Sequence, residues 1–185
     1  MTEMIIWGAG GQAKVLRDCM SKSGLKLVAL FDNDEKTASP FEGVPLFYGK
    51  PGAEKWWRGR KTENPVGFLV AVGGFRGKDR VEIHDYLSSL GGIPLTARHE
   101  TAFIATNARI GKGSQILANA SVCAEAVLGK GCIINTASSV DHECVLGDGV
   151  HIGPGARLAG CVEVGPFSGI GRSEEHTSEL QSPDH

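Results

Sequence analysis

The sequence lacks the features of several common protein classes. No apolar run approaches the length of a membrane span, and no charged segment followed by an apolar one opens the chain, so we expect neither membrane insertion nor a secretory leader. The 19 basic and 21 acidic residues give a formal net charge of −2, which does not indicate a nucleic-acid partner. With 185 residues, of which 41% are hydrophobic, the chain can form two modest domains.

Cysteine is scarce, and its spacing forms no motif. The five cysteines show no spacing typical of metal ligands, and their odd number argues against a disulfide framework; they are Cys19, Cys123, Cys132, Cys144 and Cys161. Cys132 and Cys144 fit a packed interior as compact apolar residues. We therefore predict no metal site and a reduced, cytoplasmic location.

What the sequence does contain is a six-residue repeat. Twelve aliphatic residues recur every six positions, namely Ile104, Ile110, Ile116, Val122, Leu128, Ile134, Val140, Leu146, Ile152, Leu158, Val164 and Ile170. Four positions after each of the first eleven stands a compact residue: Ala108, Ser114, Ala120, Ala126, Cys132, Ser138, Cys144, Val150, Ala156, Val162 and Ser168. This pattern is typical of a parallel β-helix built from hexapeptide repeats.

The repeat also predicts the geometry of one coil. A compact residue and the next aliphatic residue are two positions apart, so both point to the same face of a strand. Three strands and three corners make a coil of eighteen residues, and equivalent positions of successive coils stack about 4.8 Å apart. Glycine often follows the aliphatic residue, where we expect it to adopt the backbone angles of a corner: Gly111, Gly129, Gly147, Gly153 and Gly165.

The first hundred residues follow a different pattern. Short apolar segments alternate with glycine-rich turns and helical segments, which is typical of a parallel α/β domain of about four strands. Predicted strands cover residues 4–7, 26–31 and 66–72, and predicted helices cover residues 12–22, 53–58 and 78–90. Ala13, Leu16 and Met20 should face the interior from the first helix.

A glycine-rich segment from Gly8 to Ala13 joins the first predicted strand to the first helix. Backbone amides at such a helix start attract phosphate, and Asp32 follows the second strand at the distance expected for a carboxylate that contacts ribose or base. The motif does not separate a redox dinucleotide from a nucleotide sugar, and glycine also occurs there for tight packing alone. A dehydrogenase, moreover, would leave the β-helix unexplained.

One corner of the predicted coil gathers ionisable side chains. Asp141, His142 and Glu143 occupy it and should project away from the packed interior, within reach of a neighbouring chain. Eighteen positions to either side of His142 stand Ala124 and Gly160, whose small size leaves space beside the imidazole. An imidazole is suited to accept a proton because its ordinary pKa, about 6.5, lies near working pH.

His151 is the second histidine of the coils. It should be the outward residue of a later strand, flanked in its column by Ile133 and Gly169. Such a histidine is usually solvated and without a chemical role. A β-helical zinc enzyme of the carbonic-anhydrase kind would need a third coil histidine, and residues 100–171 contain none besides His142 and His151.

Four segments carry a resemblance to a known family: GAGGQAKVL near the start, FDND after the second strand, AVGG after the next, and NTASSVDHECVLGDGVHIGPGARLAG in the coils. Over residues 4–171 the chain resembles the sugar acyltransferases that include UDP-4-amino-sugar N-acetyltransferases (PglD type) and sialic-acid O-acetyltransferases (NeuD type). The resemblance implies a Rossmann-like α/β domain that holds a nucleotide sugar, followed by a left-handed parallel β-helix. It also implies acetyl-CoA along the coils and homotrimers with active sites between subunits.

The resemblance assigns roles to residues. It implies that His142 is the general base beside Glu143, that Gly160 directs a backbone donor at the acetyl carbonyl, and that Asn135 and His151 lie near the thioester and acceptor. The expected cofactor-binding residues are His151 and Gly160, and the expected substrate-binding residues are Gly8, Gly10, Gly11, Gln12, Asp32, Asn33, Gly73 and Asn135. Gln12 departs from the family, which usually has histidine there; glutamine can bind substrate but cannot carry a proton at neutral pH.

The expected reaction is direct transfer of an acetyl group from acetyl-CoA to a sugar amine or hydroxyl, on a nucleotide-activated amino sugar or a sialic acid, without a metal. We expect domains at residues 1–98 and 99–171, and a tail at 172–185 that resembles a translated sequencing adapter, a natural acidic tail being the alternative. Because the repeats stop after Gly171, the β-helix should be incomplete. The chain as written should then be inactive or prone to aggregate, and a non-catalytic scaffold is the main alternative function.

Overall fold

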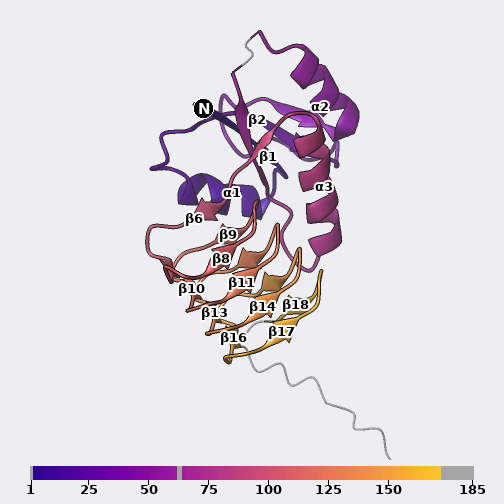
Figure 1. The fold of residues 1–185 in the computed structure, drawn as a ribbon. Coiled ribbons are helices and arrows are strands. Elements are labelled where there is room, and N and C mark those ends of the chain that lie inside the picture. The colour runs from indigo at the N-terminus through magenta and orange to yellow at the C-terminus, as the bar shows by residue number, and fades with distance from the viewer. Residues whose placement is uncertain (1, 62–63, 172–185) are drawn as a thin grey trace, which may run out of the picture.

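The structure is a computed structural model that describes residues 2–61 and 64–171. An α/β domain lies on one face of a triangular stack of coils (Figure 1). The expected tail, residues 172–185, lies outside the described residues. Of the helices in the two described ranges, none has both the length and the apolar character that crossing a bilayer requires.

The N-terminal domain contains a parallel sheet of five strands in the order β3-β2-β1-β4-β5. Its strands are β1 (Glu3–Trp7), β2 (Lys26–Asp32), β3 (Leu46–Tyr48), β4 (Val66–Val70) and β5 (Ile93–Pro94). Its helices are α1 (Gly11–Cys19), α2 (Gly49–Arg58) and α3 (Gly77–Ser89). The predicted elements are confirmed within a few residues at their ends, whereas β3 and β5 are too short to leave a hydrophobic period in the sequence.

Both faces of this sheet are covered, which explains why its central strand β1 is apolar without alternation. Met4 and Ile6 pack with Ala13 and Leu16 of α1, and that same cluster includes Leu117 and Ile133 of the coils. The opposite face packs against α2 and α3 in a second cluster that contains Ile5, Trp7, Ala53, Ile83 and Leu87. The first face of the domain is therefore also its contact with the β-helix.

The coils form three parallel sheets, one for each side of the triangle. Their orders are β16-β13-β10-β7, β17-β14-β11-β8 and β18-β15-β12-β9-β6. The strands are β6 (Ala97–Arg98), β7 (Phe103–Ile104), β8 (Arg109–Ile110), β9 (Gln115–Ile116), β10 (Ser121–Val122), β11 (Val127–Leu128), β12 (Ile133–Ile134), β13 (Ser139–Val140), β14 (Val145–Leu146), β15 (His151–Ile152), β16 (Arg157–Leu158), β17 (Glu163–Val164) and β18 (Gly169–Ile170). Each strand from β7 onward ends in one of the twelve repeated aliphatic residues, as the repeat predicts.

The eighteen-residue register is confirmed by the strand pairing. Val122 pairs with Ile104 on one side and with Val140 on the other, each eighteen positions away. The aliphatic and compact residues fill one interior cluster, and those of the middle coils are fully buried. The first strand of the coils, β6, begins at Ala97 and pairs with β9.

The corner glycines have a different cause from the one we expected. The positive φ angles fall at the third position after the aliphatic residue, not the first, in ten consecutive repeats: Gly113, Asn119, Glu125, Gly131, Ala137, Glu143, Gly149, Gly155, Cys161 and Phe167. A Cβ atom at Gly111 would instead overlap the backbone of Gly129 in the next coil. Glycine is therefore needed at that position because successive coils approach closely, not because of its conformational freedom.

Arg80 joins the two parts of the chain. Its side chain projects from α3, is fully buried, and donates from Nε to the carbonyl oxygen of Gly131 at 2.6 Å and from Nη2 to that of Gly149 at 2.7 Å. Its Nη1 donates to the carbonyl oxygen of Val72 at 2.8 Å. Burial lowers the pKa of Arg80 to about 10, so the guanidinium remains charged at neutral pH.

Replacing Arg80 should weaken the attachment of the N-terminal domain to the coils. We expect Arg80→Met to lower the free energy of unfolding by about 3 kcal/mol or more, because three carbonyl groups lose charged donors without gaining access to water. Urea unfolding followed by circular dichroism measures the change. Arg157→Met is the matched control, since Arg157 is exposed on β16; equal losses in both variants would contradict this role for Arg80.

Candidate active site

Seven of the predicted substrate-binding residues line one cleft of the N-terminal domain. The cleft has a volume of about 360 Å³ and lies where β1, β2 and β4 end. The seven residues are Gly8, Gly10, Gly11, Gln12, Asp32, Asn33 and Gly73. In parallel α/β sheets, ligands bind beyond the carboxyl ends of the strands, so this cleft is the candidate nucleotide site.

The glycine loop leaves backbone donors accessible to this cleft. Gly8 has a φ of 109°, and a Cβ atom there would lie 2.5 Å from the carbonyl oxygen of Ala71, so only glycine fits. Gly10 caps α1, with no side-chain cap and no acidic residue in the first turn. Nothing lies within 4 Å of a Cβ atom built at Gly10 or Gly11. The first amides of α1 can therefore bind a phosphate group.

Asp32 ties the glycine loop to the loop after β2. Its Oδ2 accepts the backbone N–H of Ala9 at 2.7 Å, and its Oδ1 accepts that of Asp34 at 3.0 Å. Each carboxylate oxygen has a further lone pair, which can accept a ribose hydroxyl. Asn33, which is exposed, lies next to it at the edge of the cleft.

Gln12 connects the cleft to the coils. Its Nε2 donates to Oε1 of Gln115 at 2.7 Å, and Nε2 of the fully buried Gln115 donates to the carbonyl oxygen of Val70 at 2.7 Å. The Oε1 atom of Gln12 lies beside Gly73, on the cleft side. The side-chain amide of Gln12 thus attaches the glycine loop to β9 and leaves Oε1 as an acceptor for a ligand.

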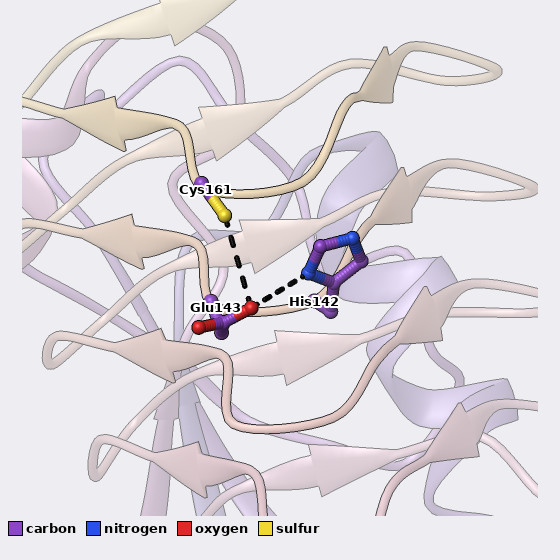
Figure 2. Close-up of side chains that lie close together, drawn as sticks. All are labelled: His142, Glu143 and Cys161. Carbon is purple, nitrogen blue, oxygen red and sulfur yellow. Dashed lines mark hydrogen bonds and ion pairs between the residues drawn. The ribbon is translucent and has the colours of Figure 1, made fainter.

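The side chains of His142 and Glu143 project from a corner of the coils as predicted (Figure 2). His142 Nδ1 lies 3.0 Å from Oε2 of Glu143, and the side chains of His142 and Glu143 are 54% and 57% exposed. Asp141 accepts the backbone N–H of His142 at 2.7 Å and does not bond to the ring. Because a carboxylate only accepts, a neutral His142 holds its proton on Nδ1 and offers Nε2 as a base.

Gly160 determines where that ring can lie. A Cβ atom at this position would overlap Nε2 of His142, so glycine allows the imidazole to lie across the next coil. Backbone bonds hold the neighbouring corners in register: Glu143 N–H donates to the Ala124 carbonyl oxygen, and Cys161 N–H to that of His142, both at 2.9 Å. The predicted stack of Ala124, His142 and Gly160 is therefore confirmed.

Asn135 and His151 lie together, but beneath the N-terminal domain. His151 Nδ1 lies 2.9 Å from the carbonyl oxygen of Gly74, and Nε2 lies 3.0 Å from Nδ2 of Asn135, whose Oδ1 accepts the N–H of Thr136. The partners require a neutral His151 with its proton on Nδ1. The residue is 6% exposed, its ring contacts Phe75, and burial lowers the pKa of His151. His151 therefore orients the side-chain amide of Asn135, and this contact occupies Nε2 of His151.

The two groups of predicted residues lie on different sides of the triangle. His142 follows β13 and precedes β14, whereas His151 belongs to the sheet of β12 and β15 that the N-terminal domain covers. The corner between two sides of a triangle is opposite the third side. His142 therefore points away from the cleft of its own chain, and contacts neither Asn135 nor His151 among the residues that the structure describes.

Two residues at these sites were not predicted. Arg76 lines the cleft and is held by Asp79, its Nε lying 2.8 Å from Oδ2; its place two residues after AVGG was the available signal. Cys161 Sγ lies 3.8 Å from Oε2 of Glu143. Desolvation and, next, the Glu143 charge raise the pKa of this thiol. The eighteen-residue distance between Glu143 and Cys161 could have revealed this contact.

Comparison with known proteins agrees with this description. Residues 3–87 match the model of the PglD N-terminal domain, and residues 125–160 match that of the bacterial transferase hexapeptide, six repeats. A comparison with curated protein sequences gave no match.

Several solved structures have the same fold. The acetyltransferase domain of PglB from Neisseria gonorrhoeae, in complex with acetyl coenzyme A, is 32% identical with a TM-score of 0.77, over 92% of this chain and 79% of that one. A variant of perosamine N-acetyltransferase from Caulobacter crescentus, with one histidine replaced by asparagine and in complex with CoA and GDP-perosamine, is 29% identical with a TM-score of 0.81. This match covers 92% of this chain and 78% of that one. WeeI from Acinetobacter baumannii, at 21% identity and a TM-score of 0.77 over 93% and 79%, shares the fold.

A PglD-type α/β domain followed by hexapeptide repeats defines a class of acyltransferases built on a left-handed parallel β-helix. The predicted fold class is therefore confirmed. Within that class, this chain belongs to the family of PglD-type sugar acetyltransferases.

The His151 network predicts a pH dependence of stability. Burial lowers the pKa of His151 in the folded protein, so the unfolded chain binds a proton first as pH falls through about 6.5. The stability that the neutral His151 contributes is therefore present above that pH and is lost below it. In Asn135→Asp the new carboxylate should accept a proton from Nε2 and raise the His151 pKa. Imidazole NMR titration measures both proteins; a wild-type His151 that titrates at or above 6.5 would contradict the assignment.

Proposed function

We propose that the protein transfers the acetyl group of acetyl-CoA to the amine of a nucleoside-diphosphate amino sugar, with His142 as general base. The observation that carries the proposal is the exposed imidazole of His142, whose Nδ1 is held by Glu143 while Nε2 remains a free base. It stands in a fold whose solved relatives were captured with acetyl coenzyme A, or with CoA and GDP-perosamine.

The cleft supports binding of the acceptor through its nucleotide. The open amides of Gly10 and Gly11 at the start of α1 suit the diphosphate, and Arg76 adds a positive charge beside them. Asp32 and Asn33 suit the ribose or base. A nucleotide in this position would direct its sugar out of the open end of the cleft.

The chemistry requires one base and one donor to the oxyanion. As the sugar nitrogen bonds to the acetyl carbon, it loses a proton to Nε2 of His142, and Glu143 stabilises the resulting imidazolium. The C–S bond then breaks, and the departing thiolate takes a proton from the imidazolium. No covalent intermediate on the protein is required.

Gly160 supplies the proposed donor for the oxyanion. Within the described residues, no hydrogen bond occupies its backbone N–H, and the imidazole of His142 lies across the side of Gly160 where a Cβ atom would stand. A preorganised amide at this position commonly contributes a few kcal/mol to transition-state stabilisation. In this scheme Asn135, held by His151, acts nearer the acceptor as a positioning residue.

We further propose that the active site forms between protomers of a homotrimer. The cleft and His142 of one chain face away from each other, so a complete site needs the cleft of one protomer and the corner of the next. A closed cyclic assembly satisfies this for every copy, because each interface then contains one cleft and one His142.

The test is release of CoA thiol with a panel of nucleoside-diphosphate amino sugars, with sialic acids as the alternative acceptors. The match covers 79% of the Neisseria relative, so the assay includes a second protein in which the corresponding C-terminal segment of that relative replaces residues 172–185. Amine-dependent thiol release by either protein supports the proposal. Binding of acetyl-CoA without transfer to any acceptor would favour the scaffold alternative.

In this assay His142→Ala should lower kcat at least ~100-fold, because the attacking amine then loses its base. The KM for acetyl-CoA should change little. His99→Ala is the matched control, because His99 is a partly exposed histidine whose ring, within the described residues, bonds to Thr101 and does not line the cleft. If His142→Ala retained more than about a tenth of the activity, a different group would be the base.

Mixing two inactive variants tests the shared site. His142→Ala lacks the base, and Asp32→Ala lacks the carboxylate that holds the glycine loop and is proposed to bind the ribose or base. Homotrimers of either variant should therefore be inactive. Mixed trimers should recover about a quarter of wild-type activity, since random assembly pairs an intact cleft with an intact His142 at one interface in four. If mixing restores no activity, the site lies within one chain.

A further inference from the structure

The corner that carries His142 also holds a thiol for which the proposed reaction has no role. Cys161 is exposed and occupies the same position of its coil as Glu143 does in the preceding one. Both residues have positive φ angles, 58° for Glu143 and 60° for Cys161. Figure 2 shows the carboxylate of Glu143 between the sulfur and the imidazole.

These three side chains present different metal-ligand atoms at short range. One ring nitrogen of His142, a Glu143 carboxylate oxygen and Cys161 Sγ all lie within 4.8 Å of one another. Nδ1 is the ring nitrogen that lies 3.0 Å from Oε2 of Glu143. It is the one such group of three among the residues that the structure describes. The backbone bonds from Glu143 to Ala124 and from Cys161 to His142 fix the two corners, so the cluster does not depend on a mobile loop.

The distances suit a zinc-type ion. Zinc binds cysteine sulfur at about 2.3 Å and histidine nitrogen or carboxylate oxygen at about 2.0–2.2 Å, in tetrahedral geometry. Ligand atoms around one ion are therefore about 3.2–3.8 Å apart. The observed Nδ1–Oε2 distance is 3.0 Å and the Sγ–Oε2 distance is 3.8 Å, so small side-chain rotations would bring all three atoms onto one ion.

We propose that His142, Glu143 and Cys161 form a binding site for Zn²⁺, and that the bound ion switches off the base of the transferase. The thiol of Cys161 releases its proton to solvent as the Zn–S bond forms, and Glu143 contributes one oxygen. A water molecule takes the fourth position. Binding is independent of the reaction, whereas the loss of activity rests on the proposed role of His142.

The switch follows from the two nitrogens of one ring. When zinc takes the lone pair of Nδ1, the single proton of the neutral imidazole moves to Nε2, through water. Nε2–H is a donor and cannot accept the proton of an attacking amine. Occupancy of the site therefore inhibits transfer without closing the cleft for the nucleotide.

The experiment uses the wild-type 185-residue protein and two serine variants. Zinc alone is titrated against a chromophoric chelator, and Co²⁺ is used as an absorbing substitute that reports a metal–thiolate bond. We expect one equivalent of zinc per chain and a thiolate-to-cobalt absorption band. Cys161→Ser should weaken zinc binding by ~100-fold or more, since a charged ligand is lost. Cys123→Ser should leave binding unchanged, because this partly exposed thiol lies one coil earlier, in the column of Asp141, and outside the group of three.

Two further measurements separate this site from the proposed function. Nitrogen NMR of His142 should show the proton on Nδ1 without zinc and on Nε2 with zinc, whether or not the chain is active. In the thiol-release assay, zinc should inhibit the wild type and Cys123→Ser but not Cys161→Ser. Equal zinc affinity in all three proteins would overturn the site, and zinc binding with the proton retained on Nδ1 would overturn the switch. Full transfer by the zinc-bound, Nε2-protonated protein would instead reject His142 as the base.

Discussion

Hydrogen bonding between successive coils is the constraint on which the rest of the molecule depends. Each strand donates to the carbonyl groups of the strand eighteen residues later, as Cys123 does to Val140. A triangle of two-residue strands can satisfy these bonds only if every coil has the same length. The interior then needs one aliphatic and one compact residue per side, and every corner position is copied eighteen residues further on.

This constraint explains what the sequence could predict. A strict period reveals the interior columns, the stack around His142, and the projection of Asp141 and Glu143. In the N-terminal domain, alternating strands and glycine turns predicted the cleft, because the carboxyl ends of parallel strands meet at one edge. Seven residues from three separate segments therefore came together as expected. The cause of the corner glycines was missed, since a period shows where a residue recurs but not which atoms it approaches.

Contacts between the two parts of the chain could not be predicted in the same way. Gln115, Ile133 and His151 are outward residues of the coils, and an isolated coil would expose them to solvent. They are buried because the α/β domain covers that side. Arg80 looks like an ordinary surface residue of α3 until three carbonyl oxygens are placed around it. No local pattern encodes which side of a triangular prism a second domain will choose.

The eighteen-residue period of the coils also limits how such a chain can change in length. Adding or removing one residue inside a coil would shift all later corners out of register with the earlier ones, and would move the imidazole of His142 off the gap left by Gly160. A change of eighteen residues would preserve every column and only slide the following corners along the prism axis by about 4.8 Å. Viable relatives should therefore differ within the coils by whole turns, or carry their extra residues as loops that leave the triangle at a corner.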